Sequence, residues 1–224
     1  MVKVERPPAP ESLSLHADEW TQQLLDEIAR TGKYSLVPET VKERYRQEDV
    51  KEALEAMYNG KCCYCESGIG HSDFPHIEHR KPKADPRFHH LSFAWDNLHW
   101  SCTICNNNKR NQWDELHPIL DPVIDDPEEH FTFDIENCEA VAMQTPGRGA
   151  TTIAHTKLNR KELVLARERI KRLLLYYAEI NRDNRETFLR LVHKLLVVQT
   201  EHGEKAEYSM FIKKMLNDVW GITV

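Results

Sequence analysis

The amino-acid sequence predicts an α+β protein that is mostly helical, with a small strand–strand–helix core between N-terminal helices and a C-terminal helical bundle. Two Cys-x-x-Cys pairs bracket residues 62–105, and two short strand-like segments lie inside this stretch. Apolar residues recur at three- and four-residue spacing on either side of it, as they do in amphipathic helices. We therefore expect four regions: an arm and helices over 1–59, the core over 60–116, a turn segment with a hairpin and linker over 117–149, and helices over 150–224.

Composition limits the classes of protein to which the chain can belong. No run approaches the roughly 20 apolar residues that cross a bilayer, and the N-terminus lacks the apolar segment of a signal peptide. We therefore expect a cytoplasmic protein with no membrane partner. In that reducing compartment its six cysteines should bind metal rather than form disulfides.

Charge is unevenly distributed along the chain. The formal net charge of −6 argues against a general nucleic-acid coat protein, which is usually basic. Cations nevertheless collect beside the cysteine pairs, which suits contact with phosphate at one confined site. These cations are Arg80, Lys81, Lys83 and Arg87 after the first pair, and Lys109 and Arg110 after the second.

The N-terminal region is expected to be scaffold. Residues 1–12 are rich in proline and should form an irregular arm. Helical periodicity predicts a helix over 17–31 that ends at Gly32, and a second helix over 49–58 that ends at 59–60. Both helices are interpreted as packing beside the core.

The cysteine pattern favours zinc, whose four tetrahedral ligands two Cys-x-x-Cys turns can supply. The expected ligands are Cys62, Cys65, Cys102 and Cys105. Cys63 is a second candidate, although only Cys62 has the two-residue spacing to Cys65, and the lone Cys138 is interpreted as a buried thiol. Because this zinc closes a long loop, it should contribute directly to folding. Four cysteines leave no open coordination position, so the zinc is expected to be structural and catalysis must use other residues.

Residues of a second kind lie between the cysteine pairs. Residues 75–80 and 98–101 are predicted to be strands, and 103–112 is predicted to be a helix. Glu78 is a hard oxygen ligand suited to Mg²⁺ or Mn²⁺. Its neighbour His79 is neutral near pH 7 and can take a proton from water.

The predicted helix over 103–112 adds polar groups to the same site. Asn106, Lys109 and Arg110 stand at i, i+3 and i+4, so we expect all three on one face, with the Asn106 carbonyl on the metal. The amide of Asn97 both donates and accepts, which suits it to pinning the loop that positions His79. The expected phosphate contacts are Lys109, Arg110, Arg80 and Lys83.

Several polar side chains keep two interpretations. His76 shares a strand face with Glu78 and is either a metal or substrate contact or an ordinary strand residue. Three tryptophans either stack bases or pack the core; they are Trp95, Trp100 and Trp113. Three aspartates either bind a second metal or make turns; they are Asp121, Asp125 and Asp126.

The last third of the chain is predicted to be a hairpin followed by helices. The hairpin strands are 130–135 and 139–143, and 144–149 is a linker. Helices follow, the first capped by Asn159 and running to Ile180, then 183–199 and 204–220. They either pack on the core or offer a groove to a partner. The charged face of the first helix, which includes Arg167, is either solvated or in contact with substrate.

The ordered motifs Cys-x-x-Cys, Glu-His, Asn-Leu and Cys-x-x-Cys-Asn-x-x-Lys resemble the HNH endonucleases. This resemblance implies a ββα-metal core that cleaves phosphodiesters with one divalent metal ion. It implies that His79 is the general base, that Asn97 is the N of the motif, and that Glu78 and Asn106 hold the catalytic ion. The chain departs from the commoner pattern at Glu78, where the family more often has Asp.

A wider resemblance covers about residues 60–133. The strings KCCYCE, IEHRKPK, WDNLHWSCTICNNNKRN and ILDPVIDDPEEHFTF are similar to the PtuB family, the HNH component of Septu-type antiphage systems, which also occurs in some retron operons. The resemblance implies that this chain is a nuclease subunit with an ABC-type ATPase partner, PtuA. DNA is the expected substrate, with RNA such as tRNA as an alternative. The competing class is a non-catalytic zinc module that binds nucleic acid or a partner protein, although such a module needs no acid, base and Asn in this order.

Overall fold

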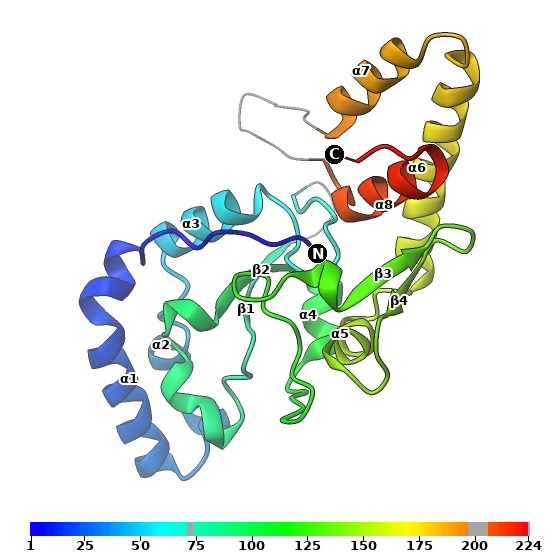
Figure 1. Cartoon of the computed structure of the whole chain (residues 1–224). Coiled ribbons are helices and arrows are strands. Elements are labelled where there is room, and N and C mark those ends of the chain that lie inside the picture. The colour runs from blue at the N-terminus through cyan, green and yellow to red at the C-terminus, as the bar shows by residue number, and fades with distance from the viewer. Residues whose placement is uncertain (71–73, 197–205, 224) are drawn as a thin grey trace.

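The computed structural model describes residues 1–70, 74–196 and 206–223 (Figure 1). The N-terminal part contains α1 (Glu11–Thr31), η1 (Tyr34–Leu36), α2 (Glu39–Lys42) and α3 (Glu48–Tyr58). The middle contains β1 (Pro75–His79), η2 (Pro86–Leu91), η3 (Trp95–Asn97), β2 (Leu98–Cys102), α4 (Thr103–Lys109), η4 (Pro127–Glu129), β3 (Phe131–Asp134) and β4 (Glu139–Ala142). The C-terminal part contains α5 (Arg148–Thr156), α6 (Lys161–Ile180), α7 (Arg185–Leu196) and α8 (Ser209–Trp220). The prediction of a mostly helical α+β protein is confirmed.

The central unit has the predicted order of strand, loop, strand and helix. β1 and β2 pair antiparallel, from Pro75 opposite Cys102 to His79 opposite Leu98. α4 begins directly after β2, where the Cys102 sulfur caps the helix by accepting a hydrogen bond from the backbone N–H of Cys105 at 3.4 Å. Every residue of β2 is buried, and α3 packs against this strand.

The N-terminal helices pack on the central unit, as the sequence predicts. α1 is longer than predicted. It begins at Glu11 rather than near residue 17, directly after Pro10. Proline is compatible with the start of a helix, and the Glu11 carboxylate favours the positive end of the helix dipole. Gly32 ends α1 in the left-handed conformation, with φ 77°, and Asn59 ends α3 with φ 51°, as the sequence predicts.

The predicted hairpin is present as β3 and β4, which pair from Phe131 opposite Ala142 to Asp134 opposite Glu139. Asn159 does not cap α6, because the N-cap position belongs to Arg160. Its amide instead accepts from the backbone N–H of Ala140 at 2.7 Å and donates to the Ala140 carbonyl at 2.8 Å. Asn159 therefore connects β4 to the segment between α5 and α6 and does not start a helix.

The sequence prediction starts its first C-terminal helix at Asn159 and therefore misses α5, whose first residues overlap the expected linker over 144–149. α5 packs against both α4 and β4. A Cβ atom at Gly149 would lie 2.1 Å from the backbone oxygen of His130, so only glycine lets the helix approach the hairpin this closely.

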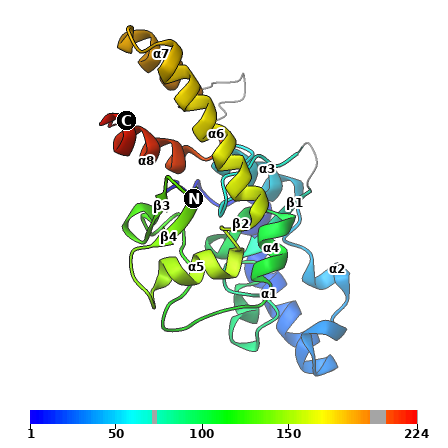
Figure 2. The same cartoon turned by 90° about the vertical axis from the view of Figure 1, so that its right-hand side faces the viewer.

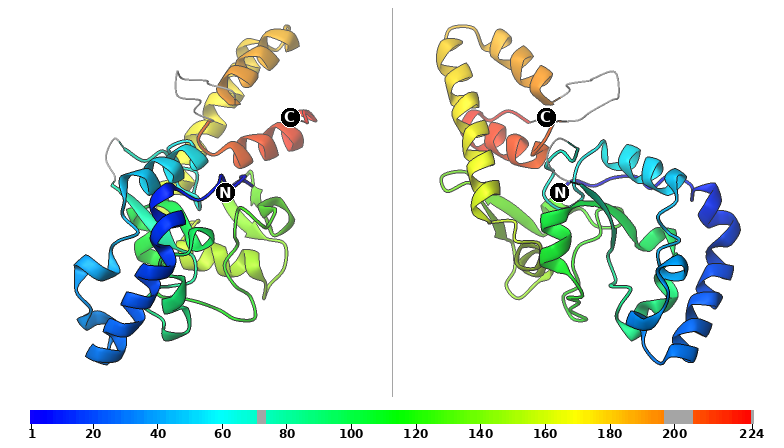
Figure 3. Two further views of the ribbon diagram at one scale, coloured as in Figure 1. Left: turned by 90° about the vertical axis from the view of Figure 1, so that its left-hand side faces the viewer. Right: turned by 180° about the vertical axis from the view of Figure 1, so that it is seen from behind.

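The C-terminal helices form a second hydrophobic cluster around fully buried side chains such as Leu174, Met215 and Leu216. α6 leaves the central unit and α7 and α8 pack against it (Figure 2). Seen from behind, these helices and the N-terminal helices lie on opposite sides of the central unit (Figure 3). The parts of the predicted helices over 197–199 and 204–205 lie outside the described residues.

Arg167 corrects the expectation for the charged face of α6. Its side chain is neither solvated nor available to a substrate, because it is 2% exposed. The guanidinium donates to the carbonyls of Cys138 at 2.6 Å and Leu158 at 2.9 Å and lies over the ring of Phe133. Helical periodicity cannot show that a cation finds buried carbonyl partners on a neighbouring element.

Across the described ranges, we find no helix with both the length and the apolar character needed to span a membrane.

Candidate metal centre and active site

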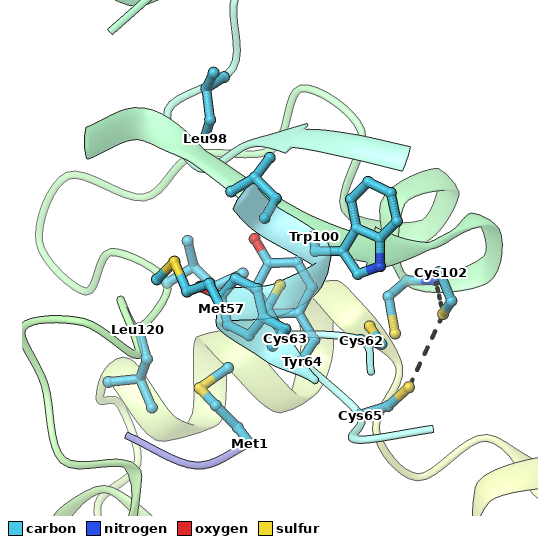
Figure 4. Packing of buried hydrophobic residues seen from close by; sticks show 14 of the residues in the cluster. Met1, Met57, Cys62, Cys63, Tyr64, Cys65, Leu98, Trp100, Cys102 and Leu120 are labelled. Carbon is cyan, nitrogen blue, oxygen red and sulfur yellow. Dashed lines mark hydrogen bonds between the residues drawn. The ribbon is translucent and has the colours of Figure 1, made fainter. Parts of the chain in front are cut away.

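Four buried cysteines gather where the 62–65 turn meets the start of α4. They are Cys62, Cys65, Cys102 and Cys105, and their sulfur atoms all lie within 4.8 Å of one another. Figure 4 shows three of them on one side of the buried cluster, with the Cys65 and Cys102 sulfurs 3.9 Å apart. Among the described residues this is the only group of three or more potential ligands. Two Cys-x-x-Cys pairs fit a closed tetrahedral zinc site, and Cys63 lies outside the group.

Arg160 reaches this cysteine centre from the N-cap of α6. Its guanidinium lies 3.4 Å from the Cys105 sulfur, 3.8 Å from that of Cys65 and 4.0 Å from that of Cys102. Burial disfavours the charge on Arg160, but Cys105 and Cys65 outweigh burial and raise its pKa above the usual value. One arginine therefore connects the C-terminal helices to the centre.

A separate cavity of about 470 Å³ contains most of the predicted catalytic residues. Glu78 and His79 reach it from β1, and Asn106 reaches it from α4. His76, Lys83 and Arg110 also line it. Residues separated by about 30 positions in the sequence are thus brought to one cavity by the pairing of β1 with β2 and by α4.

The carboxylate of Glu78 is buried and paired with Lys109. The Lys109 Nζ lies 2.5 Å from Glu78 Oε1, and the Tyr64 hydroxyl donates to the same oxygen at 3.3 Å. Burial raises the pKa of Glu78, and Lys109 opposes this rise. Both of these contacts fall on Oε1.

His79 is held as a neutral imidazole. Burial, followed by the charge of Lys83, lowers its pKa well below the usual value. Its Nε2 lies 2.9 Å from the carbonyl oxygen of Ser92. A carbonyl only accepts, so Nε2 carries the proton and Nδ1 has the free lone pair. The ring of Tyr45 meets the imidazole edge-on, with centroids 4.6 Å apart, and fixes its orientation.

Asn97 makes the kind of contacts that its amide chemistry predicts. Its Oδ1 accepts from the backbone N–H of Lys81 at 2.8 Å, while Nδ2 donates to the carbonyls of Lys81 at 3.0 Å and Leu91 at 3.2 Å. Lys81 is two residues after His79, so Asn97 fixes the loop that leaves β1.

Two of the four expected phosphate contacts point inward. Lys109 is fully buried, and besides Glu78 it donates to the His79 carbonyl at 2.7 Å. It does not share a face with Arg110, because Arg110 has φ 49° and leaves the helix. Arg80 donates to the carbonyl of Ile119 at 3.0 and 3.2 Å. Buried carbonyl and carboxylate partners, which spacing does not reveal, account for both corrections.

For the tryptophans and the aspartates, the structure favours a structural role over a contact with substrate or metal. Trp95 and Trp100 are buried in the main hydrophobic cluster, as packing predicts. The aspartates make turn and ion-pair contacts: Asp121 accepts from the Val123 N–H, Asp126 accepts from the Glu128 N–H, and Asp125 binds Arg148.

Sequence reasoning missed the second wall of the cavity. Tyr45, Arg46 and Lys51 line it from the N-terminal region, which was expected to be scaffold only. The signal is the run Lys-Glu-Arg-Tyr-Arg over 42–46, which places cations beside an aromatic residue.

His99, opposite Glu78 in the ladder, was also missed. It is buried, and its Nδ1 lies 2.5 Å from the Tyr58 hydroxyl while Nε2 lies 3.5 Å from Arg6 and 3.8 Å from Asp121. This network joins the N-terminal arm and α3 to β2, so His99 connects the sheet to the N-terminal region.

The fold and these two sites define a mixed α and β protein with a cysteine centre suited to a structural metal and a separate polar cavity. The chain is similar to the Septu protein PtuB of Bacillus mycoides (strain KBAB4), with 29% identity in an alignment 161 positions long that covers 59% of this chain and 55% of that protein. It is also similar to the Septu protein PtuB of Bacillus thuringiensis, with 28% identity in an alignment 183 positions long that covers 75% of this chain and 68% of the relative.

The chain therefore spans little more than half the length of the first of these relatives. No model of a known protein family matches it. The likeness to PtuB proteins that the motifs predict is confirmed.

Proposed function

We propose that the chain is a metal-dependent HNH endonuclease that hydrolyses phosphodiester bonds of nucleic acid. The observation that supports this proposal is that Glu78, His79 and Asn106 line one cationic cavity on a strand–strand–helix unit. A module that only binds nucleic acid has no use for a buried carboxylate, a neutral imidazole and an amide converging on one cavity.

In the proposed site Glu78 and Asn106 would hold the catalytic ion through the carboxylate and the side-chain amide oxygen. A bound Mg²⁺ or Mn²⁺ would supply positive charge that offsets the negative charge of the scissile phosphate during attack. Lys109 stays paired with the Glu78 Oε1 and opposes the rise in the pKa of this carboxylate that burial causes.

His79 acts as the general base. Its Nδ1 accepts a proton from the attacking water, while Ser92 keeps the other nitrogen protonated and the ring in place. Asn97 contributes indirectly, because it fixes the loop after His79. Arg110 and Lys83 line the cavity and position the phosphate.

The likeness to Septu PtuB proteins supports a role in antiphage defence together with an ABC-type ATPase of the PtuA kind. DNA is the favoured substrate. RNA such as tRNA would use the same phosphodiester chemistry and is the second candidate.

The direct test is cleavage by the purified chain, alone and with the co-encoded ATPase. Plasmid DNA and total tRNA are incubated with Mg²⁺ or Mn²⁺, and products are resolved on denaturing gels. His79→Ala should lower the rate at least about 100-fold, because it removes the base, while zinc content and the circular dichroism spectrum stay unchanged. His90→Ala is the matched control, since this histidine is exposed and lies outside the cavity.

Undiminished cleavage by His79→Ala would exclude the assigned base. Binding of DNA or tRNA without any cleavage by the wild-type complex would instead favour the non-catalytic zinc module.

A further inference from the structure

The wall of the cavity that faces the strand–strand–helix unit comes from the N-terminal region. Arg46 lies between α2 and α3, and Lys51 lies in the first half of α3. Both side chains line the cavity that contains Glu78, His79 and Asn106. Elements that pack as scaffold therefore also contribute charged groups to the site.

The cavity lining is strongly cationic, although the whole chain is acidic. Its lysine and arginine side chains are Arg46, Lys51, Lys83 and Arg110, and Glu78 is the only carboxylate that lines it among the residues that the structure describes. The chain as a whole carries a formal net charge of −6. A cationic cavity on an acidic protein attracts a polyanion to one place and leaves the remaining surface unattractive.

Arg46 is also close to the proposed base through one aromatic ring. Its guanidinium carbon lies 5.7 Å from the centroid of the Tyr45 ring, and that ring contacts His79. A phosphate bound by Arg46 would therefore lie near the imidazole but not on it.

The ion pairs of both side chains leave them accessible. Arg46 pairs with Glu43 and its side chain is 59% exposed, while Lys51 pairs with Glu48 at 2.9 Å and is 41% exposed. The Lys51–Glu48 pair is exposed on both sides, and such pairs contribute below about 1 kcal/mol, so a phosphate can compete for Lys51. Glu43 is only 21% exposed, and a phosphate would meet Arg46 on the exposed side of its guanidinium. Lys83 is less accessible, because Glu43 and Tyr45 hold it.

We propose that Arg46 and Lys51 bind the phosphates that flank the scissile bond, so that the N-terminal region forms the second wall of the substrate site. This inference rests on the proposed nuclease function and extends it to the sugar–phosphate backbone of the substrate. It names positioning residues, since neither side chain is placed on the reacting phosphate.

The test measures binding and cleavage by the full chain. Binding is followed by fluorescence anisotropy with two labelled probes, a 20-base-pair DNA duplex and a tRNA, in the His79→Ala background with Mg²⁺ over a range of salt concentrations. The variant is Arg46→Gln with Lys51→Gln. The control is Arg30→Gln with Lys33→Gln, which removes the same charge from exposed positions outside the cavity.

The double variant should weaken binding of the true substrate, and the slope of log K against log salt should become shallower by about 1 to 2, because each lost phosphate contact contributes about 0.9 for duplex DNA. In the His79-containing protein KM should rise more than kcat falls. The charge-conserving pair Arg46→Lys with Lys51→Arg should restore most of the affinity.

Each result separates this inference from the function on which it rests. Wild-type cleavage together with a wild-type salt slope in the double variant would overturn the inference alone. An equal loss in the Arg30/Lys33 control would also overturn it, because the effect would then reflect net charge. If the wild-type chain, with or without the ATPase, neither binds nor cuts either probe, the proposed function fails and the inference falls with it.

Discussion

At the residue scale, the cations near the two sites differ in role: some pair with anionic groups of the protein, and others are exposed to a ligand. Arg160 faces three cysteine sulfurs, and Lys109 neutralises the Glu78 carboxylate inside the protein. Arg110 is exposed at the cavity. Burial separates these roles: a buried cation must have an anionic or carbonyl partner, whereas an exposed one remains available to a ligand.

Arg160 should increase the affinity of the cysteine centre for zinc. Four thiolates around Zn²⁺ carry a net charge of −2, and their burial is unfavourable unless a cation or N–H donors offset it. Arg160→Gln is therefore expected to lower zinc affinity about 10-fold or more, the usual effect of losing an outer partner of a metal site. Zinc release to a chromogenic chelator measures this change.

The zinc affinity of Arg160→Lys should lie between those of the wild type and Arg160→Gln, since lysine keeps the charge but loses the planar pair of donors. Arg172→Gln is a suitable control, because Arg172 is exposed and pairs only with Glu168. Zinc release from Arg160→Gln at the wild-type rate would show that the guanidinium does not stabilise the centre.

The residues of the proposed site come from a short motif whose residue types and order are specific. The structure brings Glu78, His79 and Asn106 to one cavity, as the motif predicts, and their catalytic roles stay predictions. The inward orientation of the Lys109 and Arg80 side chains was not predictable from the sequence. Their partners, a carboxylate on β1 and a carbonyl at Ile119, become neighbours only in the folded chain.

At the scale of elements, the first residue of α5 is fixed by an ion pair to the Asp-rich turn segment. Arg148 binds Asp125 through both guanidinium nitrogens, one of them 2.6 Å from Oδ1, and also donates to the Pro118 carbonyl at 3.1 Å. The pair connects α5, which packs on α4, to the segment before the β3–β4 hairpin.

This ion pair should make stability depend on pH in the acidic range. Burial alone would raise the pKa of Asp125, but Arg148 outweighs it and lowers that pKa. A lowered folded-state pKa means that the pair stabilises the protein fully above the unfolded value of about 3.9 and loses this effect as pH falls through the folded value. Asp125→Asn should therefore lower Tm by about 2–4 °C at pH 7.

The difference in Tm between Asp125→Asn and the wild type should shrink as pH falls from about 5 toward the lowered folded-state pKa, because the unfolded chain takes up the proton first and the folded carboxylate follows. Differential scanning fluorimetry across this range measures it. Asp126→Asn is the neighbouring control, whose carboxylate accepts only a turn N–H from Glu128. A pH-independent difference for Asp125→Asn would contradict the ion-pair explanation.

Elements with strong local signals were predicted well, and those defined by tertiary contact were not. The β1–β2 and β3–β4 ladders and the end of α3 follow from strand length, turn residues and the αL residue Asn59. α5 was missed because Gly149, which reads as a linker residue, is required by the close approach of this helix to the His130 carbonyl.

At the scale of the whole molecule, the cysteine centre lies where the separate regions meet. The cysteines connect the 62–65 turn to α4, α3 packs on β2, α5 packs on α4, and Arg160 brings in the start of α6. Loss of the structural metal should therefore loosen the N-terminal and C-terminal regions together. The proposed catalytic ion has no such role, because its ligands line an open cavity.

The two metals should accordingly be separable by experiment. Brief treatment with EDTA should stop cleavage by removing Mg²⁺ or Mn²⁺ while leaving Tm unchanged, and added Mg²⁺ should restore activity. Cys105→Ser should instead abolish the zinc content and lower Tm by roughly 10 °C or more, since zinc binding contributes directly to folding. Cys63→Ser, outside the four-sulfur group, is the matched control and should retain one zinc per chain. Atomic absorption and thermal unfolding measure both effects, and a zinc-free Cys105→Ser protein with the wild-type Tm would show that the centre does not hold these regions together.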